Sequence, residues 1–286
     1  MDLSVIIVSY NVKDLLKNCL ESVFKFTKDI NFEVIVVDNN STDGSQDFIS
    51  NFKFQNSNFK FILSQENGGF SKGNNLGIKK AKGKYILLLN PDTLLVENSL
   101  KIMFAWMEAH SEVAVASCQL LNSEQKLSPT GGYFPNLFRV AAWAVFFKPF
   151  SFHPPAFFYK KEFSPDWVTG AFFMVRKEAL EKVGLLDENI FMYGEELEWC
   201  MRFKSAGWRI KYTPITKIIH LANSLPRNAV LGEFKGLKYI YEKHFSPWRQ
   251  TVLEFLLNIA AVLRIIMWSV RLKPAMAKIY LEALFL

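Results

Sequence analysis

The sequence predicts an α/β protein with a doubly wound, mostly parallel sheet, followed by a C-terminal helical tail. Short apolar runs alternate with segments that carry apolar residues at helical spacing, which is the pattern of parallel strands joined by helices. Most of these runs are continuously apolar, as expected of strands buried on both faces. With 286 residues, about half of them apolar, the chain can bury one large core.

Each element can be placed from this pattern. The expected strands of the first half are Leu3–Ser9, Glu33–Val37, Phe59–Leu63, Tyr85–Leu89 and Val113–Leu120. The expected helices are Val12–Phe24, Gln46–Phe52, Ser71–Lys80 and Asn98–His110. In the second half we expect a short helix at Leu137–Phe147 and strands at Trp167–Arg176 and Lys217–His220. Helices of this length between strands imply right-handed crossovers.

Composition narrows the class of protein. The three cysteines are far apart and form no C-x-x-C pair, which argues against a disulfide framework or a thiolate zinc site and fits a reducing cytosol. The N-terminus carries no secretory signal, so we expect a cytoplasmic protein. The formal charge is +7, and from Arg227 onward there are nine Lys or Arg against four Glu. Because this basic end is interleaved with aliphatic runs, an anionic membrane surface fits it better than nucleic acid.

The segment Lys84–Thr93 runs from a buried strand directly into a Pro-stiffened turn that carries Asp92. The carboxyl ends of strands are where open α/β sheets bind ligands, and a carboxylate there suits a divalent cation. Asp92 would equally well cap a helix that begins near Val96. This segment alone does not decide between the two interpretations.

Two loops follow the first two strands. Strand two ends in Asp38 and a run of turn-forming residues that includes Asn40, and strand one ends in Ser9, Tyr10 and Asn11. An Asx turn would explain the Asp38 loop. Because both loops lie at the same edge of a parallel sheet, we also expect them to hold a nucleotide base and a ribose.

A glycine-rich loop, Asn67–Asn75, opens the next helix and contains Gly69, Lys72 and Asn74. Loops of this kind present backbone N–H groups and a helix N-terminus to a phosphate. The loop matches neither of the two common nucleotide fingerprints, G-x-G-x-x-G and G-x-x-x-x-G-K-[ST]. We predict from it a phosphate contact rather than a specific cofactor.

Four motifs in this order resemble the nucleotide-sugar-binding half of family 2 glycosyltransferases, whose fold is called GT-A. They are VSYN at 8–11, VVDNNSTDGS at 36–45, NGGFSKGNNLGI at 67–78 and LLLNPDT at 87–93. The resemblance implies that Asp38 holds the base and that Asp92 is the metal-binding carboxylate of the D-x-D motif. Asn90 stands at the first position of that motif, as in the rhamnosyltransferase-like branch, which leaves one carboxylate for the cation.

The segment Phe191–Arg202 contains Glu195, Glu196 and Glu198 at the start of a helix. Acids in a first helical turn suit the helix dipole and need no further role. The segment also resembles the family's acidic motif, in which the second acid of an E-[DE] pair is the catalytic base. That match assigns the base to Glu196, with Glu195 beside it. With an ordinary pKa of about 4.3, Glu196 would be ionised at neutral pH.

His220 ends an apolar strand, where a lone histidine is usually structural. In the family, a histidine at this point completes the metal site opposite the D-x-D carboxylate. The resemblance therefore implies that Asp92 and His220 hold Mn²⁺ or Mg²⁺ together with diphosphate oxygens. The turn at Asn122–Leu127 also resembles a hairpin of the same branch.

The resemblance implies an inverting glycosyltransferase that moves a sugar from a dTDP- or UDP-sugar to a hydroxyl of a lipid-linked or growing glycan acceptor in cell-envelope polysaccharide biosynthesis. We expect residues 1–225 to form the catalytic domain, with a nucleotide-sugar half (1–110) and an acceptor half (111–225). A sugar-phosphate nucleotidyltransferase would instead need a glycine-rich loop directly after strand one. A catalytically silent scaffold would not need Asp92, Glu196 and His220 together.

Two apolar regions have more than one interpretation. The aromatic and Pro-rich stretch Tyr133–Phe163 is typical of irregular core or an oligomer contact, and an acceptor-facing or membrane-facing surface is the alternative. In the tail, 226–286, the segment Thr251–Val270 is long enough to span a bilayer. Its eleven Leu, Ile, Val and Phe contribute roughly −3 to −7 kcal/mol, whereas its two charges, Glu254 and Arg264, cost about 5 to 7 kcal/mol.

Because these contributions nearly cancel, we expect the tail to lie on the inner face of the cell membrane rather than cross it. The basic residues expected to face anionic head groups are Arg264, Arg271, Lys273 and Lys278. The residues expected to enter the acyl boundary are Leu256, Leu257, Leu263 and Ile266, with Trp268 at the interface. Packing of the tail helices on the catalytic domain, or in a homodimer, is the alternative.

Overall fold

The computed structural model describes residues 1–52, 58–146, 152–221 and 226–286. The main sheet is formed by β1 (Leu3–Ser9), β2 (Phe32–Asp38), β3 (Phe59–Leu63), β4 (Tyr85–Leu89), β5 (Thr93–Leu95), β6 (Val113–Leu121), β7 (Leu127–Ser128), β10 (Phe172–Arg176) and β11 (Arg209–His220). A small second sheet pairs β8 (Gly131–Gly132) with β9 (Trp167–Val168). The helices of the first 225 residues are α1 (Lys13–Phe26), α2 (Ser45–Asn51), α3 (Gly69–Ile78), α4 (Ser99–Ala109), α5 (Leu137–Phe146), α6 (Lys177–Val183), α7 (Glu195–Ser205) and the 3₁₀ helix η2 (Ala156–Lys160).

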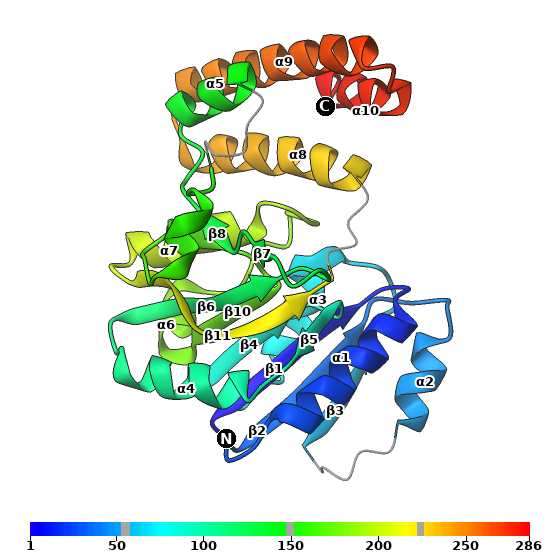
Figure 1. Cartoon of the computed structure of the whole chain (residues 1–286), viewed down its shortest axis with the longest axis vertical. Coiled ribbons are helices and arrows are strands. Elements are labelled where there is room, and N and C mark those ends of the chain that lie inside the picture. Colours follow the sequence, from blue (N-terminus) through cyan, green and yellow to red (C-terminus); the bar gives the residue numbers. More distant parts are fainter. Residues whose placement is uncertain (53–57, 147–151, 222–225) are drawn as a thin grey trace.

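The strands of the main sheet follow the order β3-β2-β1-β4-β10-β6-β11-β5, with β7 beside β6 (Figure 1). The first four run parallel to one another, so the predicted doubly wound half is confirmed. In the second half β10 runs antiparallel to both of its neighbours, and β5 runs antiparallel to β11. The sheet as a whole is therefore mixed.

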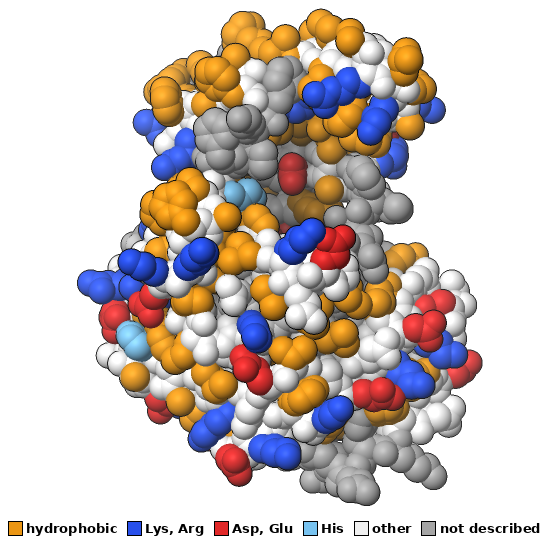
Figure 2. All heavy atoms as spheres, in the orientation of Figure 1, with side chains coloured by type: hydrophobic (Ala, Val, Ile, Leu, Met, Phe, Trp, Pro, Cys, Tyr) orange, Lys and Arg blue, Asp and Glu red, His pale blue; other side chains and the backbone are white. Residues whose placement is uncertain are grey.

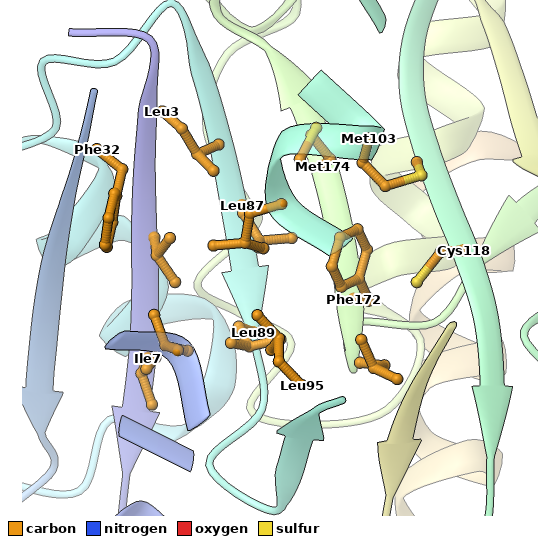
Figure 3. Packing of buried hydrophobic residues seen from close by; sticks show 14 of the residues in the cluster. Leu3, Ile7, Phe32, Leu87, Leu89, Leu95, Met103, Cys118, Phe172 and Met174 are labelled. Atoms are coloured by element: carbon orange, nitrogen blue, oxygen red, sulfur yellow. The ribbon is translucent and has the colours of Figure 1, made fainter. Parts of the chain in front are cut away.

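Helices cover both faces of this sheet, because successive side chains of each strand point to opposite sides. On one face, Leu3, Ile7, Leu87 and Leu89 pack with residues of α1, α2 and α4, and Figure 3 shows Leu87 and Leu89 between the β1 residues and Phe172 of β10. On the other face, the alternate residues of the same strands pack with α3, α6 and α7. The three cysteines, Cys19, Cys118 and Cys200, are free and buried.

Some predicted elements differ from the structure. The expected strand Trp167–Arg176 is divided into β9 and β10, with Gly170 between them. The helix expected near Val96 begins only at Ser99, and its N-cap residue is Asn98, so the interpretation of Asp92 as a helix cap is wrong. The predicted hairpin is confirmed by the antiparallel pairing of β6 and β7. Phe147, expected as the last residue of a helix, lies outside the described residues.

The C-terminal residues form three helices, α8 (Pro226–His244), α9 (Pro247–Val270) and α10 (Pro274–Leu284). Together with α5 they form a helical lobe at one end of the molecule (Figure 1). The lobe has its own core, to which Ile190 and Leu197 of the preceding α/β domain also contribute. Consequently the boundary expected near residue 225 precedes a helix that packs directly onto the domain.

Arg264 corrects the predicted orientation of the tail. Its side chain is only 4% exposed, and its guanidinium donates hydrogen bonds to the backbone oxygens of Trp143 (2.9 Å), Ala144 (3.4 Å) and Ala260 (3.1 Å). Leu257 is fully buried in the core of the lobe. Neither residue faces solvent, so the prediction that Arg264 meets head groups and Leu257 enters the acyl boundary is wrong. A helix this amphipathic buries one face against its neighbours, and the periodicity of the sequence did not show which face.

Candidate active site

A cavity of about 680 Å³ lies at the carboxyl ends of β1 and β4 and continues beneath the helical lobe, where Figure 2 shows the molecule hollowed. The predicted site residues that line it are Tyr10, Gly69, Asn90, Asp92, Glu195, Glu196 and His220. They come from both halves of the expected catalytic domain. The fold therefore gathers most of the predicted site around one cavity.

Asp92 and His220 meet because of strand pairing. β5 follows Asp92 directly and pairs antiparallel with the end of β11, which places Thr93 opposite His220. The imidazole Nε2 of His220 then lies 3.3 Å from Oδ1 of Asp92, and the two side chains are 16% and 15% exposed. The backbone N–H of Leu221 also donates to the carbonyl of Asp92 at 2.9 Å.

The chemistry of this pair fits a divalent cation. Oδ1 of Asp92 is buried and accepts no hydrogen bond from any described residue, although the His220 ring is near it. A carboxylate oxygen and an imidazole are both ligands of Mn²⁺. No group of three His, Cys, Asp or Glu side chains in the described part of the chain is arranged around an ion. The remaining ligands of such a cation would have to be the diphosphate oxygens of a bound nucleotide sugar and water molecules.

The ends of β1 and β2 leave several buried polar atoms without partners. Ser9 and Asp38 are register neighbours at the carboxyl ends of these strands. Oγ of Ser9, Oδ2 of Asp38 and Oδ1 of Asn39 have no hydrogen-bond partner among the described residues. Buried polar atoms are normally paired, so unpaired ones at a sheet edge indicate a polar ligand. Asn39, which the sequence analysis did not select, lines the cavity and donates to the carbonyl of Gly69 at 2.9 Å.

Asp38 also builds its own loop. Its Oδ1 accepts hydrogen bonds from the backbone of Ser41 (2.8 Å) and from Nε2 of Gln46 (3.2 Å), so the expected Asx turn is present. Asn11 joins the two loops, because its backbone N–H donates to Oγ of Ser41 and its Oδ1 accepts from the backbone of Thr42. These contacts fix the edge where the base was predicted to bind.

Six predicted nucleotide contacts do not line the cavity: Ser9 and Asp38, which are fully buried at the strand ends, and Asn11, Asn40, Lys72 and Asn74. Asn40 and Asn11 both have positive φ and serve the turns. Asn74 is buried and donates to the carbonyl of Phe70. Lys72 is exposed and forms an ion pair with Glu66. Its predicted role at the phosphates therefore requires that pair to open.

The acidic motif lies at the N-terminus of α7, behind Gly170. The backbone N–H of Gly170 donates to Oε1 of Glu196 at 2.9 Å. A Cβ at Gly170 would come within 2.7 Å of the Phe70 ring and 3.1 Å of Oε1, so this contact depends on glycine. Glu195 is 3% exposed, and its Oε2 has no partner among the described residues.

The pKa of Glu196 is not ordinary, in contrast to the expectation. Burial raises it, and the hydrogen bond from Gly170 only partly opposes this shift. Burial raises the pKa of Glu195 well above its usual value, and the negative charge of Glu196 adds to the effect. Two carboxyl groups this close disfavour double ionisation, so the pair holds a proton more readily than a single glutamate would.

Comparison with known proteins identifies the family. The sequence matches Glycosyl transferase family 2 over residues 4–184. The chain is 26% identical to the low-salt glycan biosynthesis hexosyltransferase Agl10 of Haloferax volcanii, over 77% of this chain and 67% of that protein. It is 25% identical to the rhamnosyltransferase WbbL of Escherichia coli, over 77% of this chain and 83% of WbbL. It is also 32% identical to the glycosyltransferase GlyG of Streptococcus pneumoniae, over 36% of this chain and 34% of GlyG.

The fold has solved counterparts. The mannosyltransferase PcManGT of Pyrobaculum calidifontis, in complex with GDP-Man and Mn²⁺, superposes with a TM-score of 0.61 at 16% identity. The superposition covers 98% of this chain and 85% of that one. This likeness confirms the predicted GT-A fold. Because the family match extends over well more than half of the residues, the chain belongs to Glycosyl transferase family 2.

Proposed function

We propose that the protein is an inverting glycosyltransferase that moves a hexosyl group from a dTDP- or UDP-sugar to a hydroxyl of a lipid-linked or growing glycan acceptor. The observation that carries the proposal is that Asp92, His220 and Glu196 line one cavity. The names of Agl10 and WbbL support a hexose as the transferred group. The name of Agl10 refers to glycan biosynthesis, which supports a role in cell-envelope polysaccharide biosynthesis.

The donor is proposed to bind across the carboxyl ends of the first strands. Ser9, Asp38 and Asn39 offer unpaired polar atoms to the base and ribose. The N-terminus of α3, which begins at Gly69, offers backbone N–H groups to a phosphate. Asp92 and His220 would hold Mn²⁺ or Mg²⁺. When bound, this ion would act as a Lewis acid that neutralises the leaving diphosphate.

Glu196 is proposed to be the general base, with Glu195 in support. The Gly170 N–H holds Oε1, which leaves the second oxygen of Glu196 for the acceptor hydroxyl. As that hydroxyl attacks the anomeric carbon, its proton passes to Glu196 and the bond to the diphosphate breaks on the opposite face of the sugar. A raised pKa improves Glu196 as a base, because proton transfer is most efficient when the pKa is near the working pH.

A panel of UDP-, dTDP- and GDP-sugars tests this proposal. One of them should raise the melting temperature in the presence of Mn²⁺ and be slowly hydrolysed, since a ligand that binds only the folded state stabilises it. The anomeric configuration of the product, read by NMR, tests inversion. Failure of every nucleotide sugar to bind, with or without Mn²⁺, would refute the proposed function.

The helical lobe is proposed to dock on the inner face of the cell membrane. Among the described helices, α9 is the one long and apolar enough to cross a membrane by length and composition alone. Its outward residues recur at helical spacing and are exposed; this outer stripe consists of Trp248, Val252, Phe255, Val262, Ile266 and Val270. Figure 2 shows hydrophobic side chains gathered over this end of the molecule, with Lys and Arg side chains below them. Such a surface suits an interfacial position on anionic lipid.

Vesicle sedimentation distinguishes docking from the alternatives. The protein should pellet with vesicles that contain phosphatidylglycerol, pellet less with pure phosphatidylcholine, and be released by high salt. The double substitution F255S/I266S should abolish pelleting without loss of fold. A stable dimer in solution that is broken by the same substitutions would replace membrane docking with the homodimer alternative.

A further inference from the structure

Beyond Glu196, the cavity extends under the helical lobe into a part for which the preceding proposal gives no role. We call this part the aromatic chamber; its lining residues are Pro135, Trp143, Phe152, Trp167, Phe234 and Leu237. Trp143 lies near both Phe152 and Phe234, with ring centroids 5.8 and 6.0 Å apart. The stretch Tyr133–Phe163, which the sequence left open between core and an acceptor-facing surface, therefore lines the cavity at Pro135, Trp143 and Phe152.

Helix α8 supplies the other wall of the chamber. Gly232 and Gly236 lie one turn apart, and a Cβ at either would come within 2.3 Å of Tyr193. These two glycines allow α8 to approach the loop before the acidic motif closely. Glu233 follows Gly232, and Leu237 follows Gly236. These two residues are one turn apart on the adjacent face of α8, and both line the cavity. The close approach thus brings a carboxyl group into the aromatic chamber.

Glu233 has no evident structural task there. No described residue forms a hydrogen bond or an ion pair with its carboxylate. Its side chain lines the cavity and is exposed to the water in it. Desolvation by the surrounding walls raises its pKa to about 7, and the positive charge of Arg264 only partly opposes the shift. A carboxyl group that lines a cavity and has no protein partner is available to accept hydrogen bonds from a ligand.

The charges that line the cavity indicate what that ligand is. The described lining residues include four carboxyl groups, Asp92, Glu195, Glu196 and Glu233, and no Lys or Arg. A phosphate group is therefore disfavoured in the aromatic chamber, away from the cation proposed for Asp92 and His220 and from the N-terminus of α3. A neutral ligand rich in hydroxyl groups suits the chamber better, because carboxyl groups accept O–H hydrogen bonds. Flat aromatic surfaces then pack against its C–H groups.

We propose that the aromatic chamber is the acceptor subsite, that it takes a neutral pyranoside, and that Glu233 selects this acceptor by hydrogen-bonding its hydroxyl groups. This inference rests on the proposed glycosyl transfer and narrows it. The sugar at the accepting end of a glycan enters the chamber, and any phosphate of a lipid carrier stays outside. Glu233 is a binding residue, whereas proton transfer belongs to Glu196.

Ligand binding can be measured without turnover. The full-length protein, with UDP or dTDP and Mn²⁺ bound, is titrated with a panel of neutral methyl pyranosides and, in a second arm, with farnesyl phosphate, both read by saturation-transfer NMR. At least one pyranoside should bind. Glu233→Leu, which keeps volume but cannot hydrogen-bond, should weaken it at least tenfold, and Glu233→Gln should restore part of the loss. Glu242→Leu, on the exposed side of α8, is the matched control and should bind as the wild type does.

Each outcome decides the inference. Pyranoside binding that Glu233→Leu leaves unchanged, or binding of farnesyl phosphate but of no pyranoside, would overturn it. Nucleotide binding and donor hydrolysis are measured on the same samples. If these persist while the pyranosides fail, only the acceptor inference is lost. If the protein binds no nucleotide sugar at all, the proposed glycosyl transfer itself has failed.

Discussion

The Nε2 atom of His220 lies 3.3 Å from Oδ1 of Asp92, although the two residues are far apart in the sequence. The short strand β5 causes this proximity, since it leaves the Asp92 turn and pairs with the last residues of β11. Each side chain is partly exposed to the cavity, and the carboxylate oxygen has no hydrogen-bond partner among the described residues. The pair is thus preformed by the sheet rather than assembled by a loop.

Replacing one member of this pair tests its role as a metal site. Asp92→Asn keeps the shape of the side chain and removes its charge. We expect turnover to fall by at least ~100-fold, because a Lewis acid contributes several kcal/mol to such a reaction. Calorimetric titration should also show that nucleotide binding no longer depends on Mn²⁺. His220→Ala should behave in the same way, and unchanged Mn²⁺ dependence in both variants would disprove the site.

The acidic pair gives a second prediction. Glu196→Gln removes a proton acceptor and little volume, so donor affinity should stay the same while transfer falls by about 10²–10⁴-fold. Glu195→Gln should retain measurable transfer, because its carboxyl group is buried behind Glu196. Single-turnover assays with labelled donor separate binding from transfer. If Glu195→Gln is inactive and Glu196→Gln is active, the roles of the two acids are reversed.

The first half of the fold was predictable from the sequence because its strands are buried on both faces. Continuous apolar runs such as Tyr85–Leu89 and the turn residues after them give an unambiguous pattern, and they carry Asp38 and Asp92 to the same sheet edge. The division of Trp167–Arg176 into two strands was not predictable. It depends on Gly170 approaching Glu196, a contact between distant segments that no local pattern records.

The helical lobe shows a different limit of prediction from sequence. The spacing of apolar residues in α9 reveals an amphipathic helix but not what covers each face. Arg264 looked like a surface charge, yet it is buried against α5. Glu233 was not among the predicted site residues, and only the docking of α8 through Gly236 places it in the cavity. Both assignments follow from tertiary packing.

Substitutions of Arg264 and of Arg271 should therefore have different effects on the stability of the protein. Arg264 donates to carbonyls in the last turn of α5, where a cation is favourable, and its guanidinium lies 4.0 Å from the centre of the Trp143 ring. Arg264→Met should lower the free energy of unfolding by about 2–4 kcal/mol, because charge-assisted hydrogen bonds are lost. Urea denaturation measures this change.

Arg271→Met is the matched control for this loss. Arg271 is exposed just after α9, near the Trp268 ring. Its substitution should change stability by no more than about 0.5 kcal/mol and should weaken binding to anionic vesicles. Equal stability of the two variants would contradict the structural role of Arg264.

Ionisation of Glu233 should make the stability of the folded protein depend on pH. The pKa of Glu233 is raised from 4.5 to about 7 in the folded protein, so between these values the folded state binds more protons than the unfolded state does. By linkage, the wild type loses stability as pH rises from about 4.5 to 7. Glu233→Gln has no proton to lose there. Its stability relative to the wild type should therefore increase over this range and stay constant at higher pH.

Melting temperatures of the two proteins between pH 4.5 and 8.5, without ligand, check this result. Glu242→Gln is the control, because Glu242 also lies on α8 but does not line the cavity. Addition of a bound pyranoside should reduce the difference between Glu233→Gln and the wild type, since a ligand that pairs with the carboxyl group removes the cost of leaving it unpaired. A constant difference in melting temperature across the whole pH range would show that Glu233 ionises as freely in the folded protein as in the unfolded chain. The aromatic chamber would then lack the desolvated carboxyl group on which acceptor selection depends.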